Sequence, residues 1–192
     1  MTRLPPPSTR RSRGVALPGL HSPAAGFDQP FEMLQACHER VQRSLDLLAR
    51  LLEHLQSHGA DADARSAAGD VWRYFEIAAP QHHLDEETHV MPRLAASADA
   101  GLRAAAQQMA DDHAQFRAIW ARVGPALLAL RDQGMLQLPA LRDDALAFIG
   151  LHAGHLLLED GLAFPAARTD LDAQQIAAMG AEMAARRQVP AR

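Results

Sequence analysis

The chain has 192 residues, a formal net charge of −4 at pH 7 and a pI near 6.2. These values suit one domain with tails and exclude the strongly basic balance of a typical nucleic-acid-binding protein. A single cysteine, Cys37, excludes an internal disulfide and favours a reducing compartment. No apolar run is long enough for a membrane helix, so we expect a cytoplasmic protein without nucleic-acid or membrane partners.

The chain divides into three parts by composition and periodicity. Residues 1–26 are rich in Pro, Arg and Ser, which predicts a disordered or loosely packed N-terminal arm. Residues 27–167 contain four long amphipathic segments and form the expected domain. Residues 168–192 form a tail, in which the amphipathic stretch 171–187 predicts a short C-terminal helix. No segment alternates with a period of two, so no β-strand is expected.

The first segment begins near Asp28, a predicted N-terminal cap, and ends at Gly59. Its apolar seam is interrupted by His38. The second segment, opened by Asp61 or Asp63, is less regular: Pro80 is expected to distort it, and its seam runs through Val71, Phe75, Ala78, His82, Glu86 and His89.

The third segment, about 102–130, is interrupted by His113 in the same way. The fourth carries His152, His155, Glu159 and Leu162 on its seam and is expected to end before Pro165. Four long helices with short connections predict an all-α fold, an antiparallel up-down four-helix bundle.

The polar residues on these seams fall at one level of the bundle. Residues equally far from a hairpin turn lie side by side, and turns near residues 60, 98 and 134 bring the polar positions within about one helical turn of each other. Unpaired burial of such groups is costly, whereas a metal binds neutral imidazoles and ionised carboxylates together. We therefore predict a metal site. The alternative is a histidine-rich polar core layer without metal.

The second helix offers two registers for this site, His82 with Glu86 or His83 with Glu87. Residues 82–92 and 155–165 share the pattern H-x3-E-[ED]-x4-P, which selects the first pair together with His155 and Glu159. In this frame His83 and Glu87 lie beside the seam, although a bend at Pro80 would favour them. His152 is expected to be a seventh ligand or a hydrogen-bonding neighbour.

The donors also indicate which metal is bound. Four imidazoles and two carboxylates exceed what one tetrahedral ion accepts, and two carboxylates can bridge a pair of ions. Imidazole and carboxylate without thiolate suit iron, then manganese or zinc.

These residues resemble the hemerythrin-like (HHE cation-binding) family over about residues 28–167. The resemblance is carried by "ACHERV", "HHLDEETHVMP", "DDHAQF" and "HAGHLLLEDGLAFP", in this order and at these intervals. It implies an oxygen-bridged non-haem di-iron centre (Fe2+/Fe3+) inside a four-helix bundle. The ligands that it implies are His38, His82, Glu86, His113, His155 and Glu159, with His83, Glu87 and His152 as further candidates.

The sequence departs from the family's oxygen carriers in two ways. They place two histidines one turn apart on the third helix, whereas Met109 and Arg117 flank His113 at those positions here. Their last carboxylate is an Asp, and here it is Glu159. These departures bring the chain closer to the bacterial forms with four His and two Glu, and they argue against simple reversible oxygen carriage.

The expected function is therefore a non-haem di-iron protein that binds or senses a small ligand such as O2 or NO, or responds to oxidants. A metal-binding module is favoured over an enzyme. The alternatives are a di-iron oxidoreductase or peroxidase, an iron-donating repair protein, and a protein for iron storage or buffering.

Overall fold

The computed structural model describes residues 25–135 and 138–187. Within these ranges the regular structure is entirely helical, and no strand is present. The predicted N-terminal arm, residues 1–26, lies almost wholly outside the described residues. No described helix is both long enough and apolar enough to cross a membrane.

The described residues form four long helical runs and one shorter helix. The first run is α1, Pro30–His58. The second joins α2 (Ala62–Arg73), η1 (Tyr74–Ala78), α3 (Ala79–Asp85), η2 (Glu86–Val90) and α4 (Met91–Ala95) without interruption. The third is α5, Ala100–Gln133, and the fourth joins α6 (Leu138–Leu158), η3 (Glu159–Ala163) and α7 (Phe164–Arg168). The shorter helix is α8, Ala173–Arg186.

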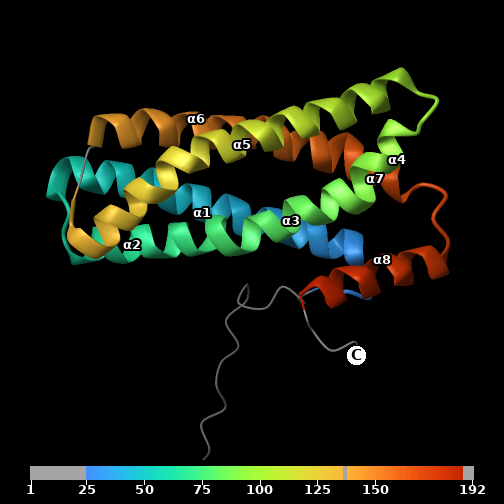
Figure 1. Cartoon of the computed structure of the whole chain (residues 1–192), viewed down its shortest axis with the longest axis horizontal. Coiled ribbons are helices and arrows are strands. Elements are labelled where there is room, and N and C mark those ends of the chain that lie inside the picture. The colour runs from blue at the N-terminus through green and yellow to red at the C-terminus, as the bar shows by residue number, and fades with distance from the viewer. Residues whose placement is uncertain (1–24, 136–137, 188–192) are drawn as a thin grey trace, which may run out of the picture.

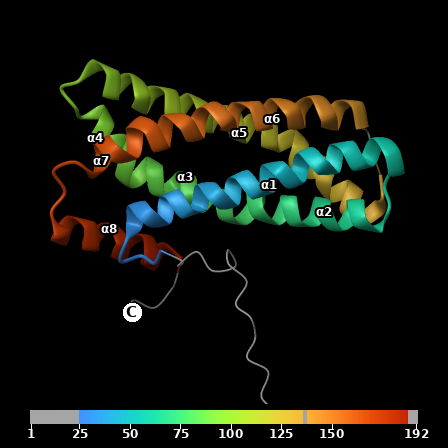
Figure 2. The same ribbon diagram turned by 180° about the vertical axis from the view of Figure 1, so that it is seen from behind.

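The four long runs lie lengthwise beside one another (Figures 1 and 2). Helix α1 packs against α2 and α6, and α5 packs against α2, α4 and α6. Short connections hold this arrangement. Asp61 and Asp99 cap α2 and α5 by accepting hydrogen bonds from backbone N–H groups, as expected for these residues. Gly59 and Gly134 end α1 and α5 with positive φ angles of 71° and 63°, which glycine adopts at little cost.

Two predicted boundaries are wrong. Gln29, and not Asp28, is the N-cap of α1, because the helix begins at Pro30, and proline is favoured at the first helical position. The fourth run does not stop before Pro165 but continues to Arg168. A short π-helical turn, η3, joins α6 to α7 and lets the fourth run continue past Pro165.

Each of three prolines, Pro80, Pro92 and Pro165, follows a π-helical turn by two residues. A proline inside a helix has no N–H to donate, and its ring clashes with the carbonyl four residues back. The wider π turn accommodates this with one extra residue, so the helix continues. The N–H before each proline bonds to the carbonyl five residues back: Ala79 to Tyr74, Met91 to Glu86 and Phe164 to Glu159.

The extra residue in each π turn shifts the buried face by one position. The predicted seam positions Ala78, His89 and Leu162 are therefore not the buried ones; Leu162 is 41% exposed. The buried residues are the next ones along the chain, Ala79, Val90 and Ala163. The same shift after η1 turns His83, as well as His82, toward the interior.

A polar layer divides the apolar core into two clusters. On α1, Leu34 belongs to one cluster and Val41 to the other, with His38 between them. On α5, Met109 and Phe116 are separated in the same way by His113. The histidines predicted to share a level thus lie at the boundary between the two clusters.

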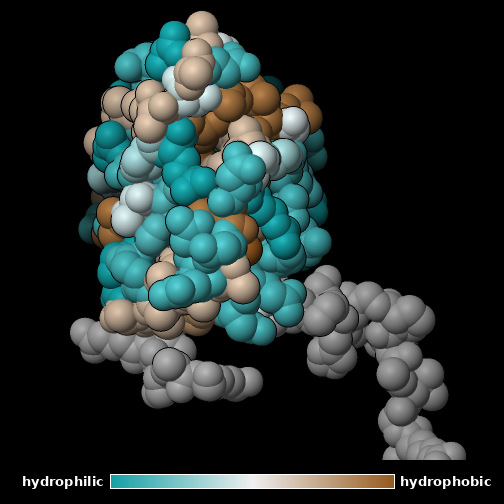
Figure 3. Space-filling model, turned by 90° about the vertical axis from the view of Figure 1, so that its right-hand side faces the viewer, coloured by the Kyte–Doolittle hydropathy of each residue, from teal (hydrophilic) through white to brown (hydrophobic). Residues whose placement is uncertain are grey.

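The predicted C-terminal helix is confirmed as α8, which begins with a capping box formed by Asp172 and Gln175. It lies outside the four long runs, against the end of the molecule where α1 begins (Figures 1 and 2). Figure 3 looks onto this end, where apolar side chains show among mostly hydrophilic ones. Within α8, Gly180 touches the backbone of Phe27, and a Cβ at Gly180 would lie 1.6 Å from the Phe27 carbonyl oxygen.

Gly180→Ala is therefore expected to destabilise the protein by about 1–3 kcal/mol, because α8 or residue 27 must move to avoid the overlap. Gly154→Ala on α6 is the matched control, since nothing lies within 4 Å of its Cβ position. It should be neutral or stabilise by about 0.5–1 kcal/mol. Urea denaturation of both variants measures this difference, and equal stabilities would contradict the close approach.

Candidate metal centre

Five imidazoles and two carboxylates meet in the polar layer and form two groups. The first group is His38, His82, Glu86 and Glu159, and the second is His83, Glu86, His113 and His155. Within each group the candidate ligand atoms all lie within 4.8 Å of one another. The two groups share Glu86, so they are adjacent.

The two carboxylates each reach toward both groups. Glu86 Oε1 lies 3.0 Å from His82 Nε2, and its Oε2 lies 3.4 Å from His113 Nε2. Glu159 Oε2 lies 3.1 Å from His38 Nε2, and its Oε1 lies 3.0 Å from His155 Nε2. Glu159 is a member of the first group, but through His155 it also contacts the second group. Each carboxylate therefore has one oxygen near each group.

The central polar atoms have no hydrogen-bond partner among the described residues. These atoms are Nε2 of His38, His113 and His155 and all four carboxylate oxygens of Glu86 and Glu159. Both glutamates are fully buried. Unpaired burial of such groups costs several kcal/mol each, whereas metal ions would coordinate all of them. The residues present therefore fit a pair of metal ions.

Acidic side chains outside the two groups orient three of the histidines. In each case Nδ1 donates to a carboxylate, so Nε2 faces the centre, as is common for metal-binding histidines. The pairs are His38 with Asp160 (3.0 Å), His113 with Glu87 (2.9 Å) and His155 with Asp112 (3.1 Å).

Sequence reasoning missed Asp112 and Asp160. Each is a chain neighbour of a predicted ligand, in "DDH" and in "ED", and that adjacency is the signal that could have found them.

No carboxylate orients His82 in this way. Its Nδ1 has no hydrogen-bond partner among the described residues. Burial disfavours the charged form of His82, but Glu86 and the neighbouring Cys37 raise its pKa well above the ordinary value. Cys37 is itself partly buried; burial alone would raise the pKa of its thiol, but His82 and Arg40 lower it overall. The thiol is therefore part of the surroundings of the first group.

The protonation of the other residues follows from burial and from their neighbours. Burial disfavours protonated His38, but the nearby carboxylates of Glu159 and Glu86 outweigh it and raise its pKa to about 9. Burial would also raise the pKa of Glu86, yet His82 and His113 keep it well below the ordinary value. Burial lowers the pKa of His83, which leaves this imidazole neutral and able to bind a metal.

The structure brings all six first-choice residues together, namely His38, His82, Glu86, His113, His155 and Glu159. It differs from the expectation for His83, which belongs to the second group and does not lie beside the site. Adjacent helical positions point about 100° apart, and the two groups lie on either side of Glu86. One turn of the second run can therefore serve both groups with His82 and His83.

Glu87 and His152 lie outside both groups. Glu87 accepts from His113 and from Arg117, so its role is to orient a histidine. His152 Nδ1 donates to the Phe148 carbonyl of its own helix, and its ring stacks on Phe116 at 3.9 Å. Burial lowers the pKa of His152 to about 3, so it is neutral. In the described structure it is neither in a ligand group nor hydrogen-bonded to one, so neither of its two expected roles is seen.

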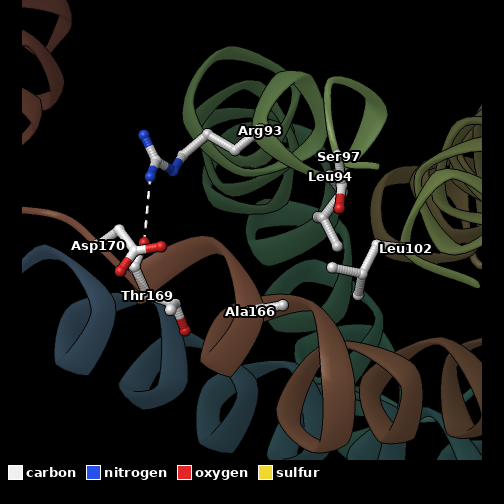
Figure 4. A pocket seen from close by; sticks show the side chains of 7 residues that line it. All are labelled: Arg93, Leu94, Ser97, Leu102, Ala166, Thr169 and Asp170. Carbon is white, nitrogen blue, oxygen red and sulfur yellow. Dashed lines mark hydrogen bonds between the residues drawn. The ribbon is translucent and has the colours of Figure 1, made fainter. Parts of the chain in front are cut away.

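The two groups have different surroundings. In the second group, Phe116 packs against His83 and His155, and His83 is partly exposed. A surface groove of about 810 Å3 between α1 and α6 reaches His38 and Asp160 beside the first group. A separate pocket of about 310 Å3 lies among α4, α5 and the segment after α7 and contains none of the candidate ligands (Figure 4). The groove thus meets the centre at His38.

Comparison with known proteins agrees with this geometry. Residues 29–167 match the model of a family described as the hemerythrin HHE cation binding domain. A protein of Haemophilus influenzae, described only as uncharacterized, is 30% identical over 165 residues. The aligned region covers 86% of this chain and 94% of that protein.

His82→Ala is expected to lower metal content more than His83→Ala. The first change removes one of two imidazoles in the first group, whereas the second removes one of three in the second group. Elemental analysis after loading with ferrous iron measures this difference. Equal losses would contradict the expected difference between a group with two imidazoles and a group with three.

In the metal-free protein, stability should fall as pH rises from about 6.5 to about 9. The pKa of His38 is raised in the folded state, so its contribution is complete below the unfolded value and is lost as pH passes the folded one. The expected loss is about 1–3 kcal/mol. Urea denaturation with a chelator across this range tests the slope, and a flat or rising profile would contradict it.

Proposed function

The chain belongs to the hemerythrin HHE cation-binding family, and on this premise we propose that it is a non-haem di-iron protein that binds and senses O2 or NO. Metal binding itself follows from the family and from the buried His/Glu groups. The identity of the ions as iron, their number and the diatomic ligand are the proposal. We also retain the expected cytoplasmic location as part of it.

The scaffold that we propose is an antiparallel four-helix bundle. The contacts of α1 with α2 and α6, and of α5 with α2 and α6, support it, since they close a ring of four runs. Each run contributes ligands from its interior face. Such a bundle positions ligands rigidly, because every ligand is held by a packed helix.

The observation that carries the proposal is the unequal number of donors in the two groups. Both groups draw on Glu86 and Glu159, but the second has three imidazoles and the first has only two, His38 and His82. Iron in such sites accepts up to about six ligands. The ion in the first group therefore has fewer protein donors, and an external ligand is expected to bind there.

Access supports the same assignment. The groove between α1 and α6 ends at His38, whose side chain is only 6% exposed. Phe164 stacks on the His38 ring at 5.0 Å and limits the space beside it. A molecule that reaches this position must be small, and a diatomic ligand meets that limit. An iron ion, if bound in the first group, would supply an open coordination position for such a ligand.

His83 changes the interpretation of one departure from the family pattern. A second histidine on the third helix, which the family's oxygen carriers have, is missing here. The second run supplies an additional imidazole instead, since His83 joins His113 and His155 in the second group. With His83 in place, the ligand set is compatible with reversible ligand binding.

Anaerobic loading with ferrous iron, followed by metal counting and optical spectra with O2 or NO, tests the proposal. We expect about two irons per chain and a ligand-dependent band that disappears when the gas is removed. Uptake of less than about one iron would refute it. Rapid consumption of peroxide would favour a peroxidase instead, and uptake far beyond two irons would favour storage.

Glu86→Gln and Glu87→Gln form a matched pair for this experiment. Glu86 is shared by both groups, so its replacement should abolish most iron binding. Glu87 lies outside the groups and orients His113, so its replacement should leave most of the iron in place. Equal iron contents in the two variants would contradict the shared position of Glu86.

A further inference from the structure

Asp85 is a buried carboxylate that belongs to neither metal group. It directly precedes Glu86 and follows His82 and His83 by two or three positions, so it lies within the turn that supplies ligands to both groups. Its side chain is fully buried. Its partners come from α8, far along the chain.

Two arginines at the end of α8 bind this carboxylate. Asp85 Oδ1 accepts from Arg186 (2.6 Å) and from Arg187 (2.9 Å), and Oδ2 accepts from Arg187 (2.6 Å). Arg187 also donates to the carbonyl of Gln81, in the same turn. Bonds between charged groups of this kind are short and strong, and loss of one partner leaves a buried charge uncompensated.

A second contact joins α8 to the ligand-bearing run on the other side of Glu86. Glu182 pairs with His89 at 2.5 Å and with Arg186 at 2.5 Å. The hydrogen bonds to Arg186 and His89 lower the pKa of Glu182 to about 2, so it is ionised. Helix α8 thus contacts the second run at Gln81, Asp85 and His89, on both sides of the bridging glutamate.

This helix lies outside the region that matches the family, residues 29–167. Its docking is nevertheless close, because Gly180 fits directly against the Phe27 backbone. Through these ionic contacts and this packing, α8 binds the turn that contains His82, His83 and Glu86 from outside the four long runs.

We propose that Arg186, Arg187 and Asp85 are positioning residues of the metal centre, and that occupancy of the centre and docking of α8 are thermodynamically coupled. Metal binding restrains His82, His83 and Glu86, and so restrains Asp85 between them. A fixed Asp85 holds α8, and by reciprocity a docked α8 favours the bound metal. The proposal rests on the metal-binding function proposed above. It makes α8 an element outside the bundle that responds to whether metal is bound.

Hydrogen exchange of the full-length protein, metal-free and loaded with Fe2+ or separately with Zn2+, tests this coupling. Loading should slow the exchange of α8 amides, residues 173–186, by about 5-fold or more, which is the lower end of typical coupling between sites. Residues 127–133, at the far end of α5, should show little change. No change in α8 upon loading would overturn the proposal.

Variants on α8 supply a second test. The R186Q/R187Q double variant should still bind metal but release it to a chelator about 5-fold faster or more, and its α8 should no longer respond to loading. Arg168→Gln is the matched control, because Arg168 is an arginine at the same end of the molecule that pairs with Glu32 of α1. It should release metal at the wild-type rate. Wild-type release from the double variant would overturn the coupling.

Comparing Fe2+ with Zn2+ distinguishes a failure of the coupling from a failure of the proposed iron function. Zn2+ uptake without Fe2+ uptake would refute the di-iron function and still test the coupling. Binding of neither ion would overturn both.

Discussion

Two buried glutamates between two sets of imidazoles are the constraint on which the rest of this structure depends. Glu86 and Glu159 are fully buried, and each directs one oxygen toward each metal group. Charges in this position are tolerated only when other charges or metal ions compensate them. In the metal-free protein the protonated histidines do so, which is why the pKa of His38 is raised. In the loaded protein the metal ions would replace those protons.

The helices reach these positions through an irregular backbone. Glu86 and Glu159 each begin a π turn, and both turns precede a proline. The extra residue widens the helix at the ligand and shifts the buried face by one position beyond it. A regular α-helix through the same residues would bury His89 and Leu162, and each proline ring would clash with the carbonyl four residues back. The distortion therefore serves both the site and the length of the helices.

Around the centre, three carboxylates of differing burial accept hydrogen bonds from the histidines. Asp112 is nearly buried and orients His155, whereas Asp160 and Glu87 are partly exposed and orient His38 and His113. Asp85 faces the opposite way and is bound by two arginines of α8. The same short turn thus connects the metal groups on its inner side to the C-terminal helix on its outer side.

The sequence by itself determined the helical fold, most helix boundaries, and the level at which His38, His82, Glu86, His113, His155 and Glu159 meet. Periodicity and distance from the turns suffice for this, because both are local properties of helices. It did not determine the role of His83, since counting in regular turns misplaces every residue beyond a π turn. It also did not identify Asp85 with Arg186 and Arg187, about a hundred residues apart. Only tertiary packing decided these, because both the rotation of the second run and the docking of α8 depend on what each face packs against.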